Sequence, residues 1–419
     1  MAEVVPFKGV LYNVSKISQK SGEDLLAPPY DIITPEYREE LYDKNPCNIV
    51  RIDFGKEFQG DNERENKYTL ARAFLRKWID EEILVKSDRP VFYAYEVAYT
   101  INGAEKKLRG FFGLVRLEEL GKGTIYPHEC THAKPKQDRL DLMRICDANI
   151  SPIFSLYNSP EKKTSGMLAD ISTTTPYLEA RDSDGSVHRL WEIKDAEQIA
   201  LITEELKDKT IFIADGHHRY ETALEYQGEM RKKHGMSGGP EPFDYVMMFL
   251  SNMSDEGLTV LPTHRLVKNI PEDTLERLSA YFEIEKVFDN FNVMYIIDSR
   301  SNVLGFYNGD ADGWYILKHR GEDLSDVHPV LRALDVTILH DLVFKKLLNV
   351  DDIVYEMDTD KTLRLVREKQ FDAAFFLNPT QVGDVETVAL ASLRMPPKST
   401  YFYPKLLTGL VLNLFNKTF

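Results

Sequence analysis

The sequence of 419 residues has only three cysteines, Cys47, Cys130 and Cys146. Three thiols are too few for a disulfide framework, and none has the close cysteine spacing of a zinc site. Cys130 lies two residues before His132, so the two could form a metal-ligand or nucleophile pair. Because no second Cys-His cluster exists to complete such a site, we expect ordinary reduced thiols.

Long apolar stretches are also missing. No uninterrupted apolar run reaches the ~20 residues that a membrane-spanning helix needs. The best stretch, residues 406–415, is too short. The opening Met1-Ala2-Glu3-Val4 lacks the basic and then apolar pattern of an export signal. We expect a soluble, cytoplasmic protein with no membrane partner.

Positive charge is in deficit. The 52 Lys and Arg residues stand against 67 Asp and Glu residues, which gives a formal net charge of −15. Such a surface repels nucleic-acid phosphates, so we expect no nucleic-acid partner. The composition is 43% hydrophobic and 28% charged, which excludes a disordered or fibrous chain. The length predicts two or three domains.

Fixed-period repeats and low-complexity tracts are absent, and strand-like and helix-like segments alternate instead. Alternation of this kind predicts an α/β (α+β) fold. We place segment boundaries near residues 105 and 265, giving three segments: 1–105, 106–264 and 265–419. The last is expected to end in an apolar helix after a proline-stiffened loop.

Several elements have clear signals. Thr34 followed by Pro35 predicts a capped helix start, and apolar residues at four-residue spacing predict a helix over 61–80. Strands over 91–100 and 106–117 flank the hairpin turn Asn102-Gly103. Further strands are predicted at 152–157, 210–214 and 245–250, and further helices at 136–149, 196–206 and 220–234.

The strongest chemical signal is the motif Asp-Gly-His-His-Arg at residues 215–219, between an apolar strand and a helix. Glycine permits a tight turn and close approach of a ligand to the backbone. The first helical turn offers N–H groups to phosphate oxygens. An arginine can grip a phosphate with two nitrogens, and a histidine can transfer protons. The alternative is a turn whose histidines serve only the structure.

A metal interpretation of the same motif is weaker. Asp215 with His217 or His218 could chelate a divalent ion, but His128 and His264 are not tied to them by spacing. Mg²⁺ brought by a nucleotide fits better, because it keeps waters and needs one or two carboxylates. We therefore predict no resident metal.

Three other segments carry weaker signals. Pro127-His128-Glu129 follows a short strand and places a carboxylate where it could act as a base; a surface glutamate is the alternative. The pair His264-Arg265 could line the same cleft or lie in an ordinary charged loop. Lys398-Ser399-Thr400 offers phosphate donors without the glycines of a Walker A motif.

Together these segments resemble a known bacterial and archaeal family. The resemblance rests on five stretches, namely Val5-Pro6-Phe7, Ala27 to Asp31, Ala214 to Tyr220, Leu261 to Arg265 and Met395 to Lys405. It spans nearly the whole chain and points to the family catalogued as domain of unknown function 1015. That name implies no activity.

A more distant likeness is more informative. The order Pro127-His128-Glu129, Arg139, Pro152-Ile153 and then the 215–219 motif resembles the core shared by partition-protein-B-like domains, sulfiredoxin and free-serine kinases. The resemblance implies that fold as a nucleotide-binding core, elaborated by N- and C-terminal α/β segments. About 50 residues separate the 152 and 211 strands here, more than in the compact relatives, and the sulfiredoxin cysteine has no counterpart. DNA binding would need a basic helix-turn-helix, which this sequence lacks.

Carried over residue by residue, the kinase likeness gives Glu129 as the base for a substrate hydroxyl, next to His128, and Asp215 for Mg²⁺ or substrate. The predicted phosphate contacts are Gly216, His217, His218, Arg219, His264, Arg265, Lys398, Ser399 and Thr400. The leading hypothesis is a kinase that uses ATP or ADP with Mg²⁺ to phosphorylate a small metabolite, first of all free L-serine to O-phosphoserine. The alternatives are a phosphohydrolase using the same phosphate cradle and a nucleotide-binding regulator without turnover. The oligomeric state stays open.

Overall fold

The computed structural model describes residues 2–16, 22–129, 133–235, 239–287, 293–298, 300–309, 313–321 and 324–415. For residues 133–135 it describes the backbone alone. Cys130 and His132, considered above as a pair, lie outside these ranges. The chain forms two compact units. The large unit comprises Met1–Pro127, Thr131–Thr259 and Pro404–Phe419, and the small unit comprises His128–Cys130 and Val260–Tyr403.

These units differ from the three segments expected from the sequence. Strands β4 (Phe92–Ile101) and β5 (Ala104–Arg116) form one antiparallel hairpin around Asn102-Gly103, with Ile101 paired to Ala104. A division near residue 105 would separate two strands that share a ladder of hydrogen bonds. The hairpin itself is confirmed where the turn residues predicted it.

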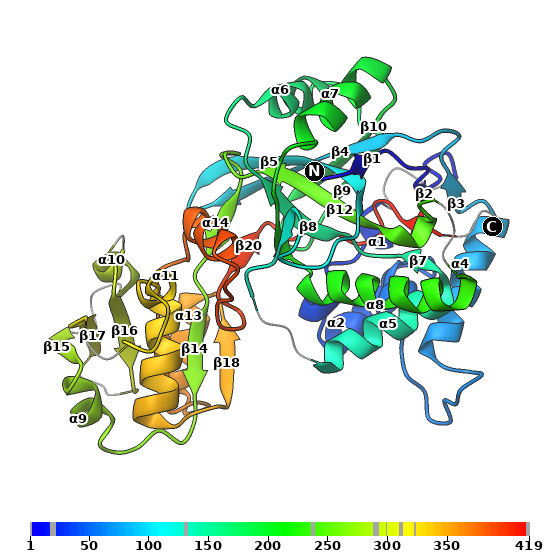
Figure 1. The fold of residues 1–419 in the computed structure, drawn as a ribbon. Coiled ribbons are helices and arrows are strands. Elements are labelled where there is room, and N and C mark those ends of the chain that lie inside the picture. Colours follow the sequence, from blue (N-terminus) through cyan, green and yellow to red (C-terminus); the bar gives the residue numbers. More distant parts are fainter. Residues whose placement is uncertain are drawn as a thin grey trace. The chain divides into compact units, whose positions relative to one another are not determined.

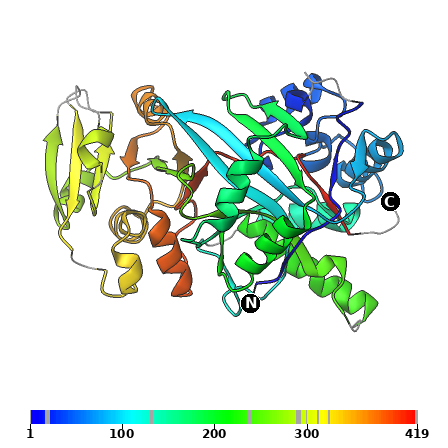
Figure 2. The ribbon, with the colours of Figure 1, turned by 90° about the horizontal axis from the view of Figure 1, so that it is seen from above.

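A mixed sheet of nine strands forms the centre of the large unit. Its order is β6-β11-β8-β12-β5-β4-β10-β9, with β1 added on β5. The remaining strands are β1 (Val4–Val5), β6 (Ile125–Tyr126), β8 (Ile153–Tyr157), β9 (Leu178–Arg181), β10 (Val187–Ile193), β11 (Ile211–Asp215) and β12 (Tyr245–Asn252). The pairs β6–β11 and β8–β12 are parallel, and the other pairs are antiparallel. Figure 2 shows β4 and β5 (cyan) beside β12 (green).

Helices cover both faces of this sheet (Figure 1). Helices α6 (Lys163–Ile171) and α7 (Ala196–Leu206) lie on one face. Helices α5 (Ala133–Cys146) and α8 (His217–His234) lie on the other, and α4 (Lys67–Asp80) packs on α5. Strands buried on both faces need apolar residues without alternation, which explains continuous apolar runs such as residues 211–214 of β11. The predicted mixed α/β class is confirmed.

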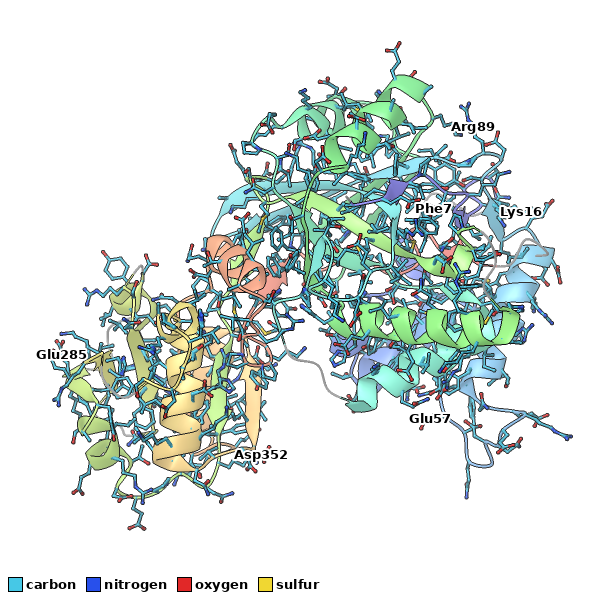
Figure 3. The ribbon with its side chains drawn as sticks, viewed as in Figure 1. Phe7, Lys16, Glu57, Arg89, Glu285 and Asp352 are labelled. Atoms are coloured by element: carbon cyan, nitrogen blue, oxygen red, sulfur yellow. The ribbon has the colours of Figure 1, made fainter. Side chains whose placement is uncertain are left out.

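Capping residues set the helix starts. The Thr34 hydroxyl accepts a hydrogen bond from the Tyr37 N–H at 3.2 Å, so α2 (Pro35–Lys44) begins as predicted. Asn66 accepts from two backbone N–H groups and starts α4 at Lys67, later than the predicted residue 61. Phe7 lies in the core, whereas Lys16 and Arg89 project outward (Figure 3).

The predicted C-terminal helix is wrong. Residues 406–415 are extended and buried, and their backbone pairs with three separate parts of the large unit. Thr408 pairs with Ala27, Leu412 pairs with Val10, and strand β21 (Asn413–Leu414) pairs with β7 (Ala148–Asn149). An apolar run surrounded on all sides has no amphipathic period, so hydrophobicity alone could not distinguish a helix from a buried strand.

The small unit is built on an antiparallel six-stranded sheet of order β15-β17-β16-β19-β14-β18. The strands are β15 (Phe282–Val287), β17 (Trp314–His319), β16 (Val303–Tyr307), β19 (Ala373–Phe376), β14 (His264–Val267) and β18 (Ile353–Glu356). Helices α9 (Thr274–Ser279), α10 (Val293–Ile297), α13 (Thr359–Arg367) and α14 (Val382–Leu390) belong to this unit, as does the π-helix Ile338–Leu348.

Candidate functional site

The 215–219 motif forms a corner in the large unit where β11 ends and α8 begins. Gly216 adopts φ 97°, and a Cβ added there would lie 2.8 Å from Arg219 Nε, so the turn requires glycine. Helix α8 starts at His217 rather than at the predicted Tyr220. His217, His218 and Arg219 therefore make up its first turn, with His217 buried.

Two cations hold the Asp215 carboxylate at this corner. Asp215 Oδ2 accepts from Lys405 Nζ at 2.6 Å, and Oδ1 accepts from Arg219 Nη2 at 3.3 Å. Arg219 Nη1 also donates to the carbonyl of Pro152, the residue just before the neighbouring strand β8. The three charged side chains are 12–21% exposed. The corner thus carries a net charge of +1 beside the positive end of a helix dipole.

Lys405 is the residue of this corner that sequence reasoning missed. It lies 190 residues from Asp215 in sequence and is brought there by the extended segment after Pro404. The one available signal was its place in the stretch Met395 to Lys405, which carries part of the family resemblance.

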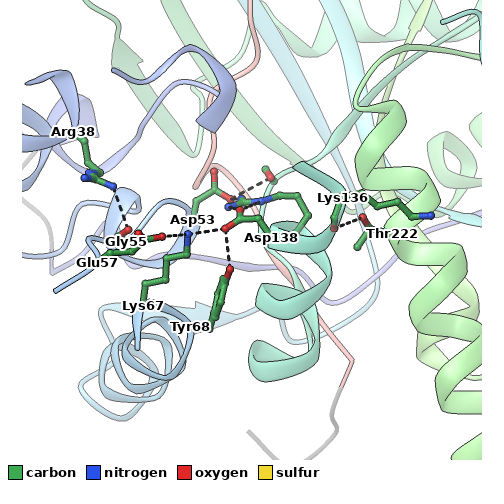
Figure 4. A network of polar contacts seen from close by, with 11 residues as sticks. Arg38, Asp53, Gly55, Glu57, Lys67, Tyr68, Lys136, Asp138 and Thr222 are labelled. Atoms are coloured by element: carbon green, nitrogen blue, oxygen red, sulfur yellow. Dashed lines mark hydrogen bonds and ion pairs between the residues drawn. The ribbon is translucent and has the colours of Figure 1, made fainter. Parts of the chain in front are cut away.

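A network of charged groups around Asp53, Lys67 and Asp138 lies in the large unit (Figure 4). Arg139 Nη1 donates to Asp53 Oδ1 at 3.0 Å, and Arg139 also pairs with Asp138, which binds Lys67 at 2.7 Å. Burial raises the pKa of Asp53, although the positive charge of Arg139 acts to lower it. Although burial alone would raise it, Arg139 and Lys67 together lower the pKa of Asp138 to about 2. The Tyr30 ring lies 4.0 Å from the Arg139 guanidinium.

Arg219 connects this network to the corner. A cavity of about 30 Å³, roughly the space of one water molecule, is lined by Asp53, Arg139 and Arg219 among others. Asp53 Oδ2 is buried there and has no hydrogen-bond partner among the described residues. Sequence reasoning named Arg139 but missed Asp53.

A second cluster gathers in the small unit around Glu129. Glu129 Oε1 accepts from the Thr400 backbone N–H at 2.9 Å and from the Thr400 hydroxyl at 2.8 Å. His128, fully buried, has Nε2 at 2.9 Å from the same hydroxyl. The Met395 N–H donates to the His128 carbonyl at 2.8 Å. Three positions that the sequence singled out for chemistry, His128, Glu129 and Thr400, are thus in contact.

His264 and Arg265 lie on strand β14, and neither side chain is exposed to solvent. This burial matches neither of the two predictions from the sequence, a lining of the cleft or a charged surface loop. His264 Nε2 is 3.0 Å from the Thr359 hydroxyl, and burial together with Arg265 lowers the pKa of His264 to about 3. Arg265 Nη2 donates to the Lys398 carbonyl at 3.0 Å. Burial lowers the pKa of Arg265 to about 10.

The 398–400 segment is a tight loop rather than a phosphate loop of the Walker type. Lys398 is exposed with φ 56°, the Ser399 hydroxyl donates to the Pro396 carbonyl at 2.6 Å, and Ser399 and Thr400 are buried. These donors serve the loop and Glu129.

The predicted site residues therefore form two clusters, each within one unit. Asp215, Gly216, His217, His218 and Arg219 belong to the large unit, and the small unit holds His128, Glu129, His264, Arg265, Lys398, Ser399 and Thr400. In the described part of the chain, no three His, Cys, Asp or Glu side chains are grouped as a metal site. No helix among the described residues is long and apolar enough to span a membrane.

Comparison with solved structures finds several similar chains. A conserved hypothetical protein from Pyrococcus furiosus is 14% identical, with a TM-score of 0.34, over 68% of this chain and 92% of its own. A free serine kinase in complex with AMP is 11% identical, with a TM-score of 0.36, over 70% and 98%. SbnI with a C-terminal truncation from Staphylococcus aureus is 10% identical, with a TM-score of 0.37, over 71% and 85%. Likenesses this low carry no argument about chemistry.

No curated protein matches the chain. In contrast, the profile of one family, described as a protein of unknown function (DUF1015), matches residues 4–337. This match covers most of the sequence and confirms the family resemblance derived from the motifs. The chain belongs to the DUF1015 family.

Proposed function

We propose that this protein is a phosphotransferase, a kinase that moves a phosphoryl group from ATP or ADP to the hydroxyl of a small metabolite. Free L-serine, giving O-phosphoserine, is our first choice of acceptor. The observation that carries the proposal is the Asp215–Arg219–Lys405 cluster at the first turn of α8. Phosphoryl transfer needs mainly positioned cations and hydrogen-bond donors around the phosphates, and this corner provides both.

In this proposal the phosphates bind at the corner of the large unit. The backbone at Gly216, His217 and His218 would approach the phosphate oxygens, and Lys405 and Arg219 would supply positive charge. Because Arg219 and Lys405 both donate to Asp215, a phosphate would compete with Asp215 for them. Once displaced from Arg219 and Lys405 by a phosphate, the Asp215 carboxylate would turn toward a metal cation instead.

Mg²⁺ fits this arrangement as an ion carried by the nucleotide. Asp215 offers one carboxylate, and Mg²⁺ in nucleotide sites takes one or two carboxylates besides phosphate oxygens and waters. Bound there, the ion would neutralise charge on the phosphates. Since each Asp215 oxygen already pairs with a cationic side chain, direct coordination requires one of these pairs to open.

Glu129 is the proposed acceptor of the hydroxyl proton, an assignment that comes from the likeness to free-serine kinases. Its carboxylate is held through Oε1 by Thr400, which leaves the group well oriented for such a task. His128 would act behind it through Thr400. We do not assign phosphate contacts to His264 and Arg265, because both are fully buried.

The decisive experiment follows the phosphorus atoms by ³¹P NMR. The protein is incubated with Mg²⁺, L-serine or a panel of hydroxylated metabolites, and ATP or ADP. A nucleotide-dependent phosphomonoester signal that is lost in Glu129→Gln, but kept in the exposed control Glu119→Gln, supports the kinase.

Two outcomes contradict it. Release of inorganic phosphate from phosphoserine without nucleotide indicates a phosphohydrolase, with His217 or His218 as acid or nucleophile. Saturable nucleotide binding with no product from any acceptor indicates a regulator.

A further inference from the structure

Arg265 is a fully buried cation with incomplete hydrogen bonding. Its side chain has no solvent exposure, and Nε has no partner among the described residues. Its two other nitrogens donate to backbone carbonyls, of Thr263 and of Lys398. No described carboxylate lies within 4 Å of it. Burying a charge without a direct counter-ion is unfavourable unless nearby groups compensate it.

Two neighbouring groups act on the charge of Arg265. The electrostatic interactions that oppose the burial effect on Arg265 involve Tyr355 and Glu129. The guanidinium lies over the Tyr355 ring, 5.4 Å from its centroid. Because Tyr355 is a neutral phenol whose pKa is raised by burial, the anionic partner at neutral pH is Glu129.

Arg265 also fixes the loop that holds Glu129. Its Nη2 donates to the carbonyl of Lys398, a residue in the left-handed region at φ 56°. The Thr380 hydroxyl donates to the next carbonyl, that of Ser399, at 2.8 Å. Thr400 follows directly and gives both its hydrogen bonds to Glu129 Oε1. One buried guanidinium thus acts on the position of Glu129 through the loop backbone.

The other titratable groups around Arg265 do not replace its charge. His264 is adjacent on β14, and His340 stacks on Tyr355 with ring planes 10° apart. Burial lowers the pKa of each histidine to about 3, so both are neutral at pH 7. Lys398 also acts on Tyr355 by its charge, but its side chain is exposed and is therefore screened by water.

We propose that Arg265 is a positioning residue that holds the 398–400 loop, and through Thr400 the Glu129 carboxylate, in the orientation that accepts the proton of the substrate hydroxyl. This proposal rests on the proposed function. It gives Arg265 a role that needs no contact with nucleotide or acceptor. The sequence analysis had instead predicted Arg265 as a phosphate contact. A carboxylate held in a fixed position suits phosphoryl transfer, which needs a proton acceptor in place rather than a strong base.

The test compares Arg265→Met and Arg265→Lys with the exposed control Arg364→Met. Arg265→Met removes the donor to the Lys398 carbonyl, so Thr400 and Glu129 lose their fixed position. We expect kcat of Arg265→Met to fall by about 10–100-fold, with KM for the nucleotide unchanged. Arg265→Lys keeps one donor for that carbonyl, so it should recover part of the lost kcat.

A folded Arg265→Met with wild-type kcat overturns the proposal, and so does a loss in which kcat and KM for the nucleotide change together. If Arg265→Met does not fold by circular dichroism, Arg265→Lys decides, because an unchanged kcat in folded Arg265→Lys contradicts the loop role. The proposed function fails separately, by full activity of Glu129→Gln. Loss of activity in Glu129→Gln together with wild-type behaviour of Arg265→Lys and Arg265→Met rejects the inference alone.

Discussion

Replacing Lys405 by methionine removes one of the two cations of the corner while keeping most of the side-chain volume. The change breaks a 2.6 Å contact with Asp215, which retains Arg219 as a partner. The net charge of the three groups falls from +1 to 0. We therefore expect a small effect on folding stability and a large effect on the binding of a polyanion.

The magnitude follows from the contact that is lost. A hydrogen bond to a charged group contributes about 1.5–3 kcal/mol, and the middle of this range, about 2 kcal/mol, corresponds to a roughly 30-fold weaker nucleotide affinity. A nucleotide at 100 times its wild-type Kd stabilises the folded state by about 2.7 kcal/mol. At the same concentration a 30-fold weaker site gives about 0.9 kcal/mol.

Thermal-shift titration with ADP and ATP, with and without Mg²⁺, measures this difference. Lys122→Met is the matched control, because Lys122 pairs with Glu119 in an exposed position. Calorimetric titration gives the Kd directly. An unchanged Kd in a folded Lys405→Met protein would remove the corner from nucleotide binding and refute the reasoning.

Three further predictions test other parts of the account. Glu129→Gln should lower turnover by about 10²–10⁴-fold with nucleotide affinity retained, measured by steady-state kinetics and calorimetry; equal losses of both would contradict separate roles. Gly216→Ala should destabilise by roughly 1–2 kcal/mol in urea unfolding, since the site has φ 97° and Arg219 lies in the way, whereas Gly228→Ala in open space within α8 should stabilise slightly. Asp138, with its pKa lowered to about 2, stabilises the fold above its unfolded pKa, and this stability is lost as pH falls toward 2. In Asp138→Asn the dependence of unfolding free energy on pH between about 4 and 2 should be shallower, and an identical slope would contradict the Asp138–Arg139 pairing.

The sequence predicted those parts of the fold that have local causes. The Asn102-Gly103 hairpin, the Thr34 cap and the helix over 196–206 depend on residues a few positions apart, and each is present. The corner at 215–219 was also found locally, because the turn at Gly216 and the end of an apolar strand leave a clear pattern.

Long-range pairings could not be predicted. Lys405 and Asp215 are 190 residues apart, and Thr400 and Glu129 are 271 apart. Nothing in the local pattern of 404–415 indicates that this segment passes through the large unit in extended form. The roles of Lys405, Asp53 and Arg265 therefore emerge from tertiary structure, since a lone charged residue in sequence says nothing of its partner.

The central claim is that the first turn of α8 and Lys405 hold a nucleotide phosphate, and a crystal structure of the protein with ADP and Mg²⁺ tests it most directly. The account predicts phosphate oxygens within hydrogen-bond distance of Lys405 Nζ and of the backbone N–H groups at 217–219, with Asp215 turned from Lys405. A nucleotide bound elsewhere, with the Lys405–Asp215 pair intact, would contradict it.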